Sequence, residues 1–450
     1  MLGRLARIDG WVLVAVVSAV PVVVVYARAL HSPPNYDEAV YLATLRELHH
    51  GVAIGVVFLS QPPGFGWLLA AIGAVTASLV TVRWIMIGLT LCGGLAAWFL
   101  GRRAGGTLGG AVAFATLAIA PPWSVLATRL EAEVPSTTLA IVALSLAEPF
   151  PILAGASFAL AVSMKLLALS AAVPLVLLAR RRLLPLAAGA LAATAVVVLS
   201  VAPHFGRVWS QSVGFHLSGR STPAPSFGDN VHRVVTFINL HQPFGLLVTA
   251  SVVVAAADAI RRRPVPWELW TWPPAAAIFL AVQHPLIDHH MQLLGAAWAV
   301  PAGVTLAGAI ARAERTGRMV AIGAMTALLA GGLYQQWGEL APQGSSPDVT
   351  AAVARLQHLV PPGSVVATDD QIVVYDAGYR EPPDLVDLSQ VRIQSGNLTI
   401  PRLLRESANA RAFVVGRSLA TNGVVLAALA RRYQRRIEVG SITIFADRRP

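Results

Sequence analysis

The sequence contains little charge, one cysteine and one lysine. Charged residues make up 13% of its 450 residues and hydrophobic residues 55%, whereas a soluble globular chain usually carries about a quarter charged residues. The single cysteine, Cys92, has no partner for a disulfide, and its apolar neighbours predict a small buried side chain. These shortages exclude an ordinary soluble protein and indicate that a lipid bilayer is the solvent.

Long apolar stretches recur along the first three quarters of the chain. The uncharged stretches 104–128, 234–257, 291–311 and 319–338 each exceed the about 18 to 20 residues that a helix needs to cross about 30 Å of hydrocarbon. The N-terminal run 11–27 lacks an Ala-x-Ala cleavage site and precedes many more spans, so we interpret it as the first span and not as a signal peptide. The pattern predicts a polytopic α-helical membrane protein with about eleven transmembrane helices.

The net charge of +11 is spread over short arginine clusters between the apolar stretches. Such clusters are typical of cytoplasmic loops, and no basic face with interleaved aromatic residues indicates nucleic-acid binding. Placing every cluster in the cytoplasm predicts a cytoplasmic N-terminus and requires that 62–80 lie at the membrane surface, as 35–50 does, instead of crossing it. The clusters are Arg4/Arg7, Arg102/Arg103, 180–182, 261–263 and Arg312/Arg315/Arg318.

This path defines the predicted spans and the segments outside the membrane. The outer segments are 31–83, 121–134, 204–234 and 284–292, and they hold most of the unusual polar residues. The spans are predicted near 10–30, 84–101, 107–122, 134–147, 150–164, 166–179, 183–203, 235–259, 265–283, 293–311 and 318–336. We therefore expect a transmembrane domain over 1–338.

The composition changes after Trp337, and we expect a small α/β domain over 339–450 outside the membrane. Short β-branched runs alternate there with helical patterns. This part has no glycine-rich phosphate loop and no nucleophile elbow, which favours a structural or acceptor-facing role. The predicted strands are 364–368, 412–415, 437–439 and 442–445, and the predicted helices are 348–359 and 422–433.

Asp37 and Glu38 form the first acidic element, in the first outer segment. Asn35 can cap the helix that follows, with Glu38 at its third position, so both carboxylates have a structural explanation. Adjacent carboxylates at a membrane surface can also hold a general base or a metal. The segment 60–66, which contains Gln61 and two prolines, follows and can begin the second surface helix.

The second acidic element is Arg129-Leu130-Glu131-Ala132-Glu133, at the outer end of the third span. Glu131 and Glu133 point in different directions on a helix, so one of them is expected to face a site. Alternatively, the two mark a solvated loop.

Lys165 is the only lysine of the chain and lies in a stretch otherwise free of charge. This indicates either a side chain that snorkels to the membrane interface or a functional group that meets a phosphate.

The outer segment 284–292 contains three histidines and an aspartate. His289 and His290 follow Asp288 directly, and His284 begins the segment. Three interpretations are open: ligation of a divalent metal, hydrogen bonding to a substrate or phosphate, and interfacial packing. Neither a His-x-x-x-His pair nor a cysteine ligand accompanies these residues, so no metal is identified.

These motifs together resemble the protein O-mannosyltransferase and aminoarabinose transferase group of GT-C glycosyltransferases. The resemblance rests on Asp37-Glu38 after the first span, on Gln61-Pro62-Pro63-Gly64-Phe65, and on the tail motifs at 366–371 and 382–387. It implies two juxtamembrane helices in the first outer loop and a polyprenyl-phosphate sugar donor used on the extracytoplasmic face of a bacterial-type inner membrane. The acceptor is a lipid, a glycan or a protein.

The resemblance also implies roles for individual residues. The catalytic aspartate of the group falls on Asp37, its neighbour on Glu38, and the second acidic residue near Glu133, while a phosphate-binding lysine resembles Lys165. Gln61 stands where the group has His or Lys, and Arg129, His289 and His290 are further candidates for the phosphate. The implied reaction is a direct, inverting displacement without a required cofactor, although a divalent metal is a candidate. A lipid-linked sugar transporter or flippase is the alternative.

Overall fold

The structure is a computed structural model that describes residues 18–121, 123–219, 226–237, 242–283 and 286–447. The start of the first predicted span, the cluster Arg4/Arg7 and His284 lie outside the described residues. The chain divides into two compact units, each made of segments distant in sequence. Unit 1 comprises Met1–Leu30, Arg83–Val197 and Pro225–Ala341, and unit 2 comprises His31–Val82, Val198–Ala224 and Pro342–Pro450.

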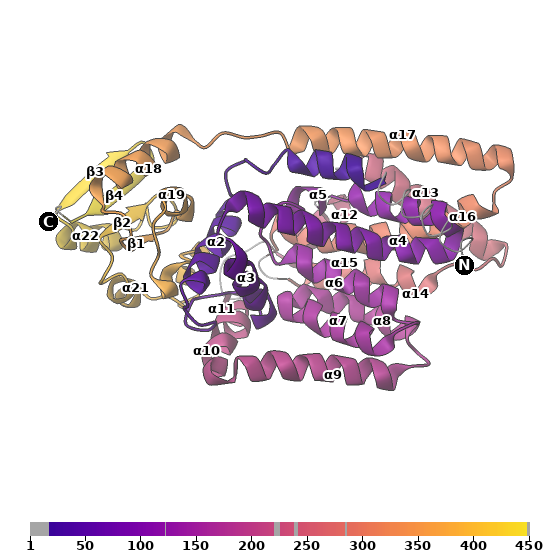
Figure 1. Cartoon of the computed structure of the whole chain (residues 1–450), viewed down its shortest axis with the longest axis horizontal. Helices are drawn as coiled ribbons and strands as arrows, with labels where there is room; N and C mark the ends of the chain where they lie inside the picture. The colour runs from indigo at the N-terminus through magenta and orange to yellow at the C-terminus, as the bar shows by residue number, and fades with distance from the viewer. Residues whose placement is uncertain (1–17, 122, 220–225, 238–241, 284–285, 448–450) are drawn as a thin grey trace. The chain divides into compact units, whose positions relative to one another are not determined.

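Unit 1 is helical, and its long helices run roughly along one direction in Figure 1. Its helices are Ser18–Ala27, α4 (Leu79–Ala118), α5 (Trp123–Leu126), α6 (Glu133–Leu146), α7 (Pro151–Met164), a 3-10 helix (Leu166–Ala171), α8 (Ala172–Leu178), α9 (Leu183–Ser200), α12 (Phe227–Thr236), α13 (Gln242–Ile260), α14 (Trp267–Trp270), α15 (Trp272–Ala281), α16 (Met291–Arg312) and α17 (Arg315–Glu339). Their shared core consists mainly of alanine, leucine and valine.

Helix α4 is two helices joined at a sharp turn, as the predicted spans 84–101 and 107–122 require. Gly105 and Gly106 depart from helical geometry, and Gly106 has a φ of 64° that favours glycine. The two arms then approach closely, because a Cβ added to Gly101 would lie 2.3 Å from the carbonyl oxygen of Gly109. Glycine therefore permits both the turn and the contact.

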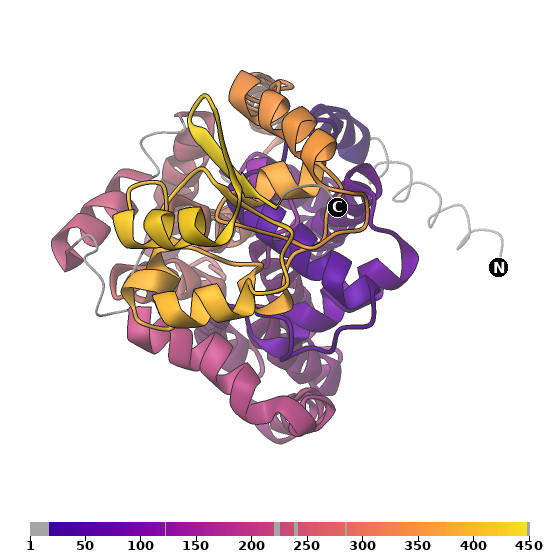
Figure 2. The same ribbon diagram turned by 90° about the vertical axis from the view of Figure 1, so that its left-hand side faces the viewer.

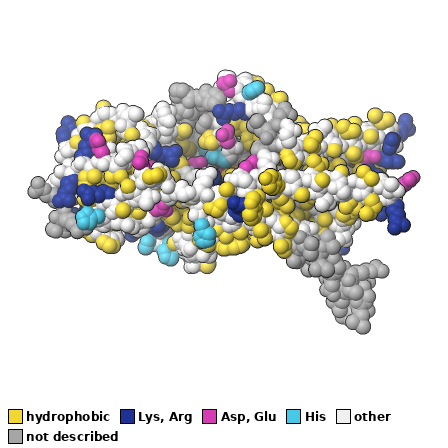
Figure 3. Space-filling view, turned by 90° about the horizontal axis from the view of Figure 1, so that it is seen from above, with side chains coloured by type: hydrophobic (Ala, Val, Ile, Leu, Met, Phe, Trp, Pro, Cys, Tyr) yellow, Lys and Arg dark blue, Asp and Glu magenta, His cyan; other side chains and the backbone are white. Residues whose placement is uncertain are grey.

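Apolar helices in this unit have the lengths expected of membrane spans. Within the described residues, five helices are long and apolar enough to cross a bilayer, and five shorter apolar helices accompany them. Figure 3 shows hydrophobic side chains over much of the surface on the side of α17, where Met319 and Val320 are exposed. The turns after α8, α13 and α16, which carry three of the arginine clusters, lie toward the same end of the unit in Figure 1.

Unit 2 joins the first outer segment to the C-terminal part of the chain. Its first segments form α2 (Tyr36–His49), α3 (Pro63–Val75), a 3-10 turn (Ala202–His204), α10 (Phe205–Trp209), a π-helical turn (Ser210–Gly214) and α11 (Phe215–Gly219). The later helices are α18 (Pro347–Leu359), α19 (Gln371–Asp376), Pro383–Leu385, α20 (Gln390–Gln394), α21 (Ile400–Glu406) and α22 (Gly423–Arg432). A small shared core of Ala43, Val57, Phe58, Phe215 and Val386 joins the three segments.

A four-stranded sheet forms the centre of the C-terminal part, in the order β1-β2-β4-β3. The strands are β1 (Val366–Thr368), β2 (Ala412–Val415), β3 (Arg435–Val439) and β4 (Ile442–Ala446); β1 and β2 are parallel, and β3 and β4 form the yellow hairpin of Figure 2. Alternate residues of β2 face opposite layers, since Val414 packs with α18 and α19 whereas Phe413 packs with α21 and α22.

Several predictions about these elements are confirmed and others are corrected. All four strands and both helices predicted after residue 339 are present, and Ala412–Val415 has the predicted bounds. The predicted surface helix 62–80 ends early, at Val75, because Thr76 is extended and its hydroxyl accepts from the backbone N–H of Ser78. Of the span predicted over 235–259, the described residues show α13 over Gln242–Ile260, with Pro243 in its first turn, whereas 235 and 236 end α12.

Cys92 is another correction, because it is exposed on α4 and not buried as we expected. A cysteine on the outside of an apolar helix is compatible with a lipid environment, which the apolar run of the sequence does not distinguish from the interior of a bundle.

Candidate functional site

Lys165 lies at a break between two helices of unit 1. Helix α7 ends at Met164, Lys165 is extended with φ −155° and ψ 130°, and the 3-10 helix begins at Leu166. Ser136 of α6 holds the break, because its hydroxyl donates to the carbonyl oxygen of Ala161 at 2.9 Å and lies 3.4 Å from that of Lys165. The break directs a long cationic side chain inward, where 8% of it is exposed.

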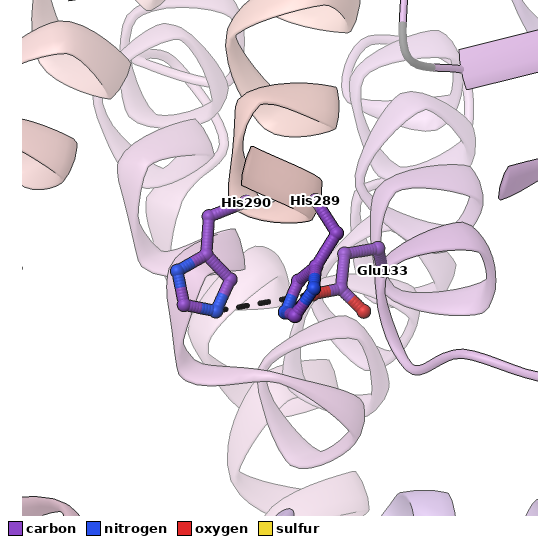
Figure 4. A group of neighbouring side chains, drawn as sticks. All are labelled: Glu133, His289 and His290. Carbon is purple, nitrogen blue, oxygen red and sulfur yellow. Dashed lines mark ion pairs between the residues drawn. The ribbon is translucent and has the colours of Figure 1, made fainter. Parts of the chain in front are cut away.

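The Lys165 ammonium donates to the carboxylate of Glu133, in the first turn of α6. His289 and His290, which immediately precede α16, point their rings at the same carboxylate, as Figure 4 shows. The distances from Glu133 Oε1 are 3.3 Å to His289 Nε2 and 4.0 Å to His290 Nε2. We call these four residues the Glu133 cluster.

The Glu133 cluster is a set of cationic or donor groups around one buried acid. Glu133 has only 4% of its side chain exposed, and an isolated carboxylate in such a place would be costly. The ion pair with Lys165 balances its charge, and His289 adds a positive charge if it is protonated. An anion such as a phosphate could therefore bind here if Lys165 and His289 turned from Glu133 toward it.

The same geometry is a candidate metal site. The ligand atoms of Glu133, His289 and His290 lie within 4.8 Å of one another, and this residue set suits zinc. However, the backbone N–H of Ile287 lies 3.4 Å from His290 Nδ1 and donates to it. A metal on Nε2 would require the proton on Nδ1, facing that donor, whereas ligating histidines normally donate from the second nitrogen. The Lys165 ammonium also binds the Glu133 carboxylate, so the present arrangement fits a metal poorly.

The predicted residues Asp37 and Glu38 lie in unit 2, in the first turn of α2. Asn35 caps this helix as predicted, since its side chain accepts from the backbone N–H of Glu38 at 2.8 Å. Because Asn35 supplies the cap, Asp37 is not needed for that purpose. Glu38 is fully buried and Asp37 half-buried, so Asp37 is the more accessible of the two carboxylates.

Gln61 supports the first outer segment instead of presenting a charged group. Its amide donates to the hydroxyl of Tyr41 on α2 at 2.9 Å, and Tyr41 packs edge-on against Phe65 of α3 at 4.9 Å. Its buried Oε1 has no hydrogen-bond partner among the described residues. Gln61 thus joins the two helices of the segment.

Arg129 and Glu131 lie in the turn that precedes α6. Glu131 is buried with 1% exposure and belongs to the turn before α6, where its backbone N–H donates to the carbonyl oxygen of Arg129 at 2.9 Å. Arg129 is half-buried, and its side chain forms no ion pair with any residue that the structure describes. Of the two acids left open by the sequence, Glu133 is the one beside Lys165 and the histidines.

Sequence reasoning missed the polar residues that surround Tyr36, next to Asp37. Arg417 stacks over the Tyr36 ring at 4.2 Å, and the Tyr36 hydroxyl lies 3.4 Å from Asp387 Oδ1. The pKa of Tyr36 is raised well above its usual value, mainly by burial and then by Asp387 and Asp37. Asp387 lies in the tail motif 382–387, and this motif was the only feature of the sequence that indicated a role for it. No feature of the sequence indicated a role for Arg417.

Comparison with known proteins relates the structure to membrane glycosyltransferases. No protein-family model matches the sequence, and no curated protein sequence matches it. The structure is similar to that of ArnT from Cupriavidus metallidurans bound to undecaprenyl phosphate, with a TM-score of 0.69, 14% identity, and coverage of 97% of this chain and 98% of that one.

A second similar structure is the Archaeoglobus fulgidus oligosaccharyltransferase in complex with Zn and sulfate. The TM-score is 0.61 and the identity 13%, over 92% of this chain and 69% of that one. The same organism's AglB in complex with an inhibitory peptide and a dolichol-phosphate gives 0.56 and 12%, over 93% of this chain and 70% of that one. ArnT and AglB are GT-C glycosyltransferases. The chain therefore has a GT-C fold, and the predicted resemblance is confirmed at the level of the fold.

Proposed function

We propose that the protein is a membrane glycosyltransferase that moves a sugar from a polyprenyl-phosphate donor to an acceptor hydroxyl on the extracytoplasmic face. The observation that carries this proposal is the Glu133 cluster, in which the only lysine of the chain is buried beside an acid and two histidines. Its support is the similarity of nearly the whole chain to ArnT, which was solved with undecaprenyl phosphate.

In the proposed reaction, Asp37 acts as the general base. It takes the proton of the acceptor hydroxyl while the hydroxyl oxygen attacks the anomeric carbon, and the bond from that carbon to the phosphate oxygen breaks. The electron pair leaves with the lipid phosphate, and a single displacement inverts the anomeric centre. Glu38 stays the alternative base, although its full burial makes it the less accessible carboxylate.

Lys165 and the two histidines are proposed to stabilise the departing lipid phosphate. An ammonium supplies a compact positive charge, and imidazole N–H groups can donate to phosphate oxygens. Glu133 holds these groups in place before the donor arrives. Arg129 is a further candidate because its half-buried guanidinium has no ionic partner among the described residues.

A divalent metal is the alternative occupant of the Glu133 cluster. A similar oligosaccharyltransferase was solved in complex with Zn and sulfate, and Glu133, His289 and His290 would be the ligands here. A bound metal would supply positive charge near a phosphate. We favour the metal-free interpretation, because Lys165 already neutralises Glu133 and because His290 Nδ1 faces a backbone donor.

The test is transfer by the purified protein in lipid nanodiscs. Radiolabelled polyprenyl-phosphate sugars are supplied with hydroxyl-bearing lipid, glycan and peptide acceptors, and labelled products are separated from the donor. Transfer of label to any acceptor supports the proposal. Movement of labelled donor across proteoliposome membranes without transfer would instead identify a flippase.

A further inference from the structure

The C-terminal part of the chain contacts the last turn of α2, the helix that carries Asp37 and Glu38 in its first turn. Arg46 donates to the backbone carbonyl oxygens of Tyr375 and Tyr379, and its guanidinium lies 4.5 Å from the centre of the Tyr375 ring. The next residue, Glu47, accepts two hydrogen bonds from Arg380, one of them 2.9 Å from Nε to Oε1. Such a two-point pair fixes orientation as well as distance.

A second contact holds the first turn of α2. The Arg417 guanidinium covers the Tyr36 ring at 4.2 Å, and Asp387 Oδ1 lies 3.4 Å from the Tyr36 hydroxyl. Tyr36 is the direct neighbour of Asp37 in the helix. The two ends of α2 therefore contact three separate segments of the C-terminal part, at 375–380, 387 and 417.

Two of these segments, at 387 and 417, are themselves held by hydrogen bonds. Asp369 follows β1, and its carboxylate accepts from the backbone N–H groups of Gly416 at 2.8 Å and Leu419 at 2.6 Å, which sets the loop that carries Arg417. Arg392 is fully buried and donates to the carbonyl oxygen of Asp387 at 2.8 Å. Hydrogen bonds from the end of β1 and from α20 therefore hold the segments that carry Arg417 and Asp387.

The Arg380–Glu47 pair buries one of its two charges, which is a costly way to join two segments. Glu47 is 1% exposed, and Glu381, beside Arg380, is 2% exposed with no hydrogen-bond partner for either carboxylate oxygen among the described residues. Apolar side chains of similar volume would join the segments at least as stably. Bidentate ion pairs instead specify a single arrangement, and a single arrangement is what a catalytic carboxylate requires.

We propose that residues 342–450 position α2, and with it Asp37, by holding both of its ends, with Arg380 and Arg417 as positioning residues. The catalytic consequence rests on the proposed function, whereas the mechanical contact does not. The C-terminal part thus acts on the reaction through the orientation of the base and does not need to touch the donor.

Hydrogen exchange of the full-length protein in nanodiscs tests the contact without relying on activity. Arg380→Gln leaves Glu47 buried and unpaired, so the amides of Tyr36–His49 should exchange at least about tenfold faster while the β2 and β4 amides stay protected. Arg380→Lys keeps the positive charge but cannot make the two-point hydrogen bond. Its α2 amides should therefore exchange at a rate between those of the wild type and Arg380→Gln. Arg436→Gln is the matched control, because Arg436 pairs at 2.7 Å with Glu438 on the exposed side of β3.

Unchanged exchange of α2 in Arg380→Gln, or equal loss of protection in the sheet, would overturn the proposal. If Arg380→Gln yields no folded protein, Arg417→Gln makes the same test at the first turn, since Arg417 is exposed and stacks over the Tyr36 ring. A specific increase in exchange at Tyr36–His49 supports the proposal in either variant.

Transfer kinetics then test the catalytic consequence. Arg380→Gln should lower kcat by at least about tenfold with KM for the donor within about twofold, because misplacing a base costs rate and not donor binding. Recovery of kcat in Arg380→Lys is the expected rescue, and an unchanged kcat in Arg380→Gln contradicts positioning. If the wild-type protein shows no transfer but α2 responds in exchange, the proposed function fails and the contact stands.

Discussion

The ammonium of Lys165 donates to the carboxylate of Glu133, 32 residues earlier in the chain. Both side chains are buried, with 8% and 4% exposed. Each charge compensates the other inside an apolar unit. Removal of one partner therefore affects both the stability of the fold and the binding of any ligand. Experiments on Lys165 must separate these effects.

We predict that Lys165→Met lowers both stability and donor affinity, whereas Lys165→Met/Glu133→Gln restores stability alone. The single change leaves Glu133 without its main counter-charge, and the double change removes that buried charge. A lost charge-assisted contact to phosphate should weaken donor binding by roughly 10- to 100-fold in both variants. Thermal unfolding and binding of the polyprenyl-phosphate sugar in detergent measure the two effects. Normal donor affinity in the double variant would remove the phosphate role.

Metal removal should leave transfer unchanged. We expect that protein purified without added metal contains no stoichiometric metal by elemental analysis, and that EDTA does not lower its activity. The first reason is that the Lys165 ammonium already binds the Glu133 carboxylate. The second is that His290 Nδ1 accepts from the Ile287 N–H, which leaves the proton of His290 on Nε2. Activity that is lost with EDTA and regained with Zn²⁺ would show instead that Glu133, His289 and His290 ligate a metal.

Buried acids make the stability of unit 2 depend on pH. Burial, reinforced by Glu47, Asp387 and Asp370, raises the pKa of Glu381 well above its ordinary value of 4.5, and Arg46 opposes this only in part. The folded state therefore binds a proton more tightly than the unfolded chain, and Glu381 costs stability increasingly as pH rises above about 4.5.

We accordingly predict that Glu381→Gln raises Tm at pH 8 by several degrees and has little effect at pH 4. A change of about 1 kcal/mol corresponds to about 2–4 °C in a domain of this size. Glu438→Gln, at an exposed position in β3, is the control and should leave Tm within a degree or so at both pH values. Equal shifts at pH 4 and pH 8 would show that the effect is not due to ionisation of Glu381.

The arginine clusters predict which side of the membrane each part of the chain occupies. In a Cys92→Ala background, a cysteine at Ser441 should react with an impermeant thiol reagent in intact cells, and one at Arg262 should not. Both positions are exposed, so accessibility depends on the membrane and not on burial. The background is needed because Cys92 is itself exposed on α4. Reversed labelling would invert the predicted topology.

Local patterns predicted local structure well, and they failed where a contact is distant. The run Ala412–Val415 identifies β2 because four apolar and β-branched residues suit a strand buried on both faces. In contrast, the choice between Glu131 and Glu133 depends on His289, more than 150 residues away, and Tyr36 and Asp387 are 351 residues apart. No spacing rule encodes such pairs, so the sequence indicated the residue types of the site but not which of them meet.

The assignment of the general base is tested by Asp37→Asn. Asn35 already caps α2 through the Glu38 N–H at 2.8 Å, so the variant should fold normally. An amide cannot take a proton near neutral pH, and loss of general-base catalysis typically lowers the rate by about 100- to 10,000-fold. We expect a fall of this size in kcat with unchanged donor binding. Asp229→Asn is the control, because Asp229 is likewise in the first turn of a helix, where it belongs to the capping box of α12. Near-normal transfer by folded Asp37→Asn protein would exclude Asp37 and leave Glu38 as the next carboxylate to test.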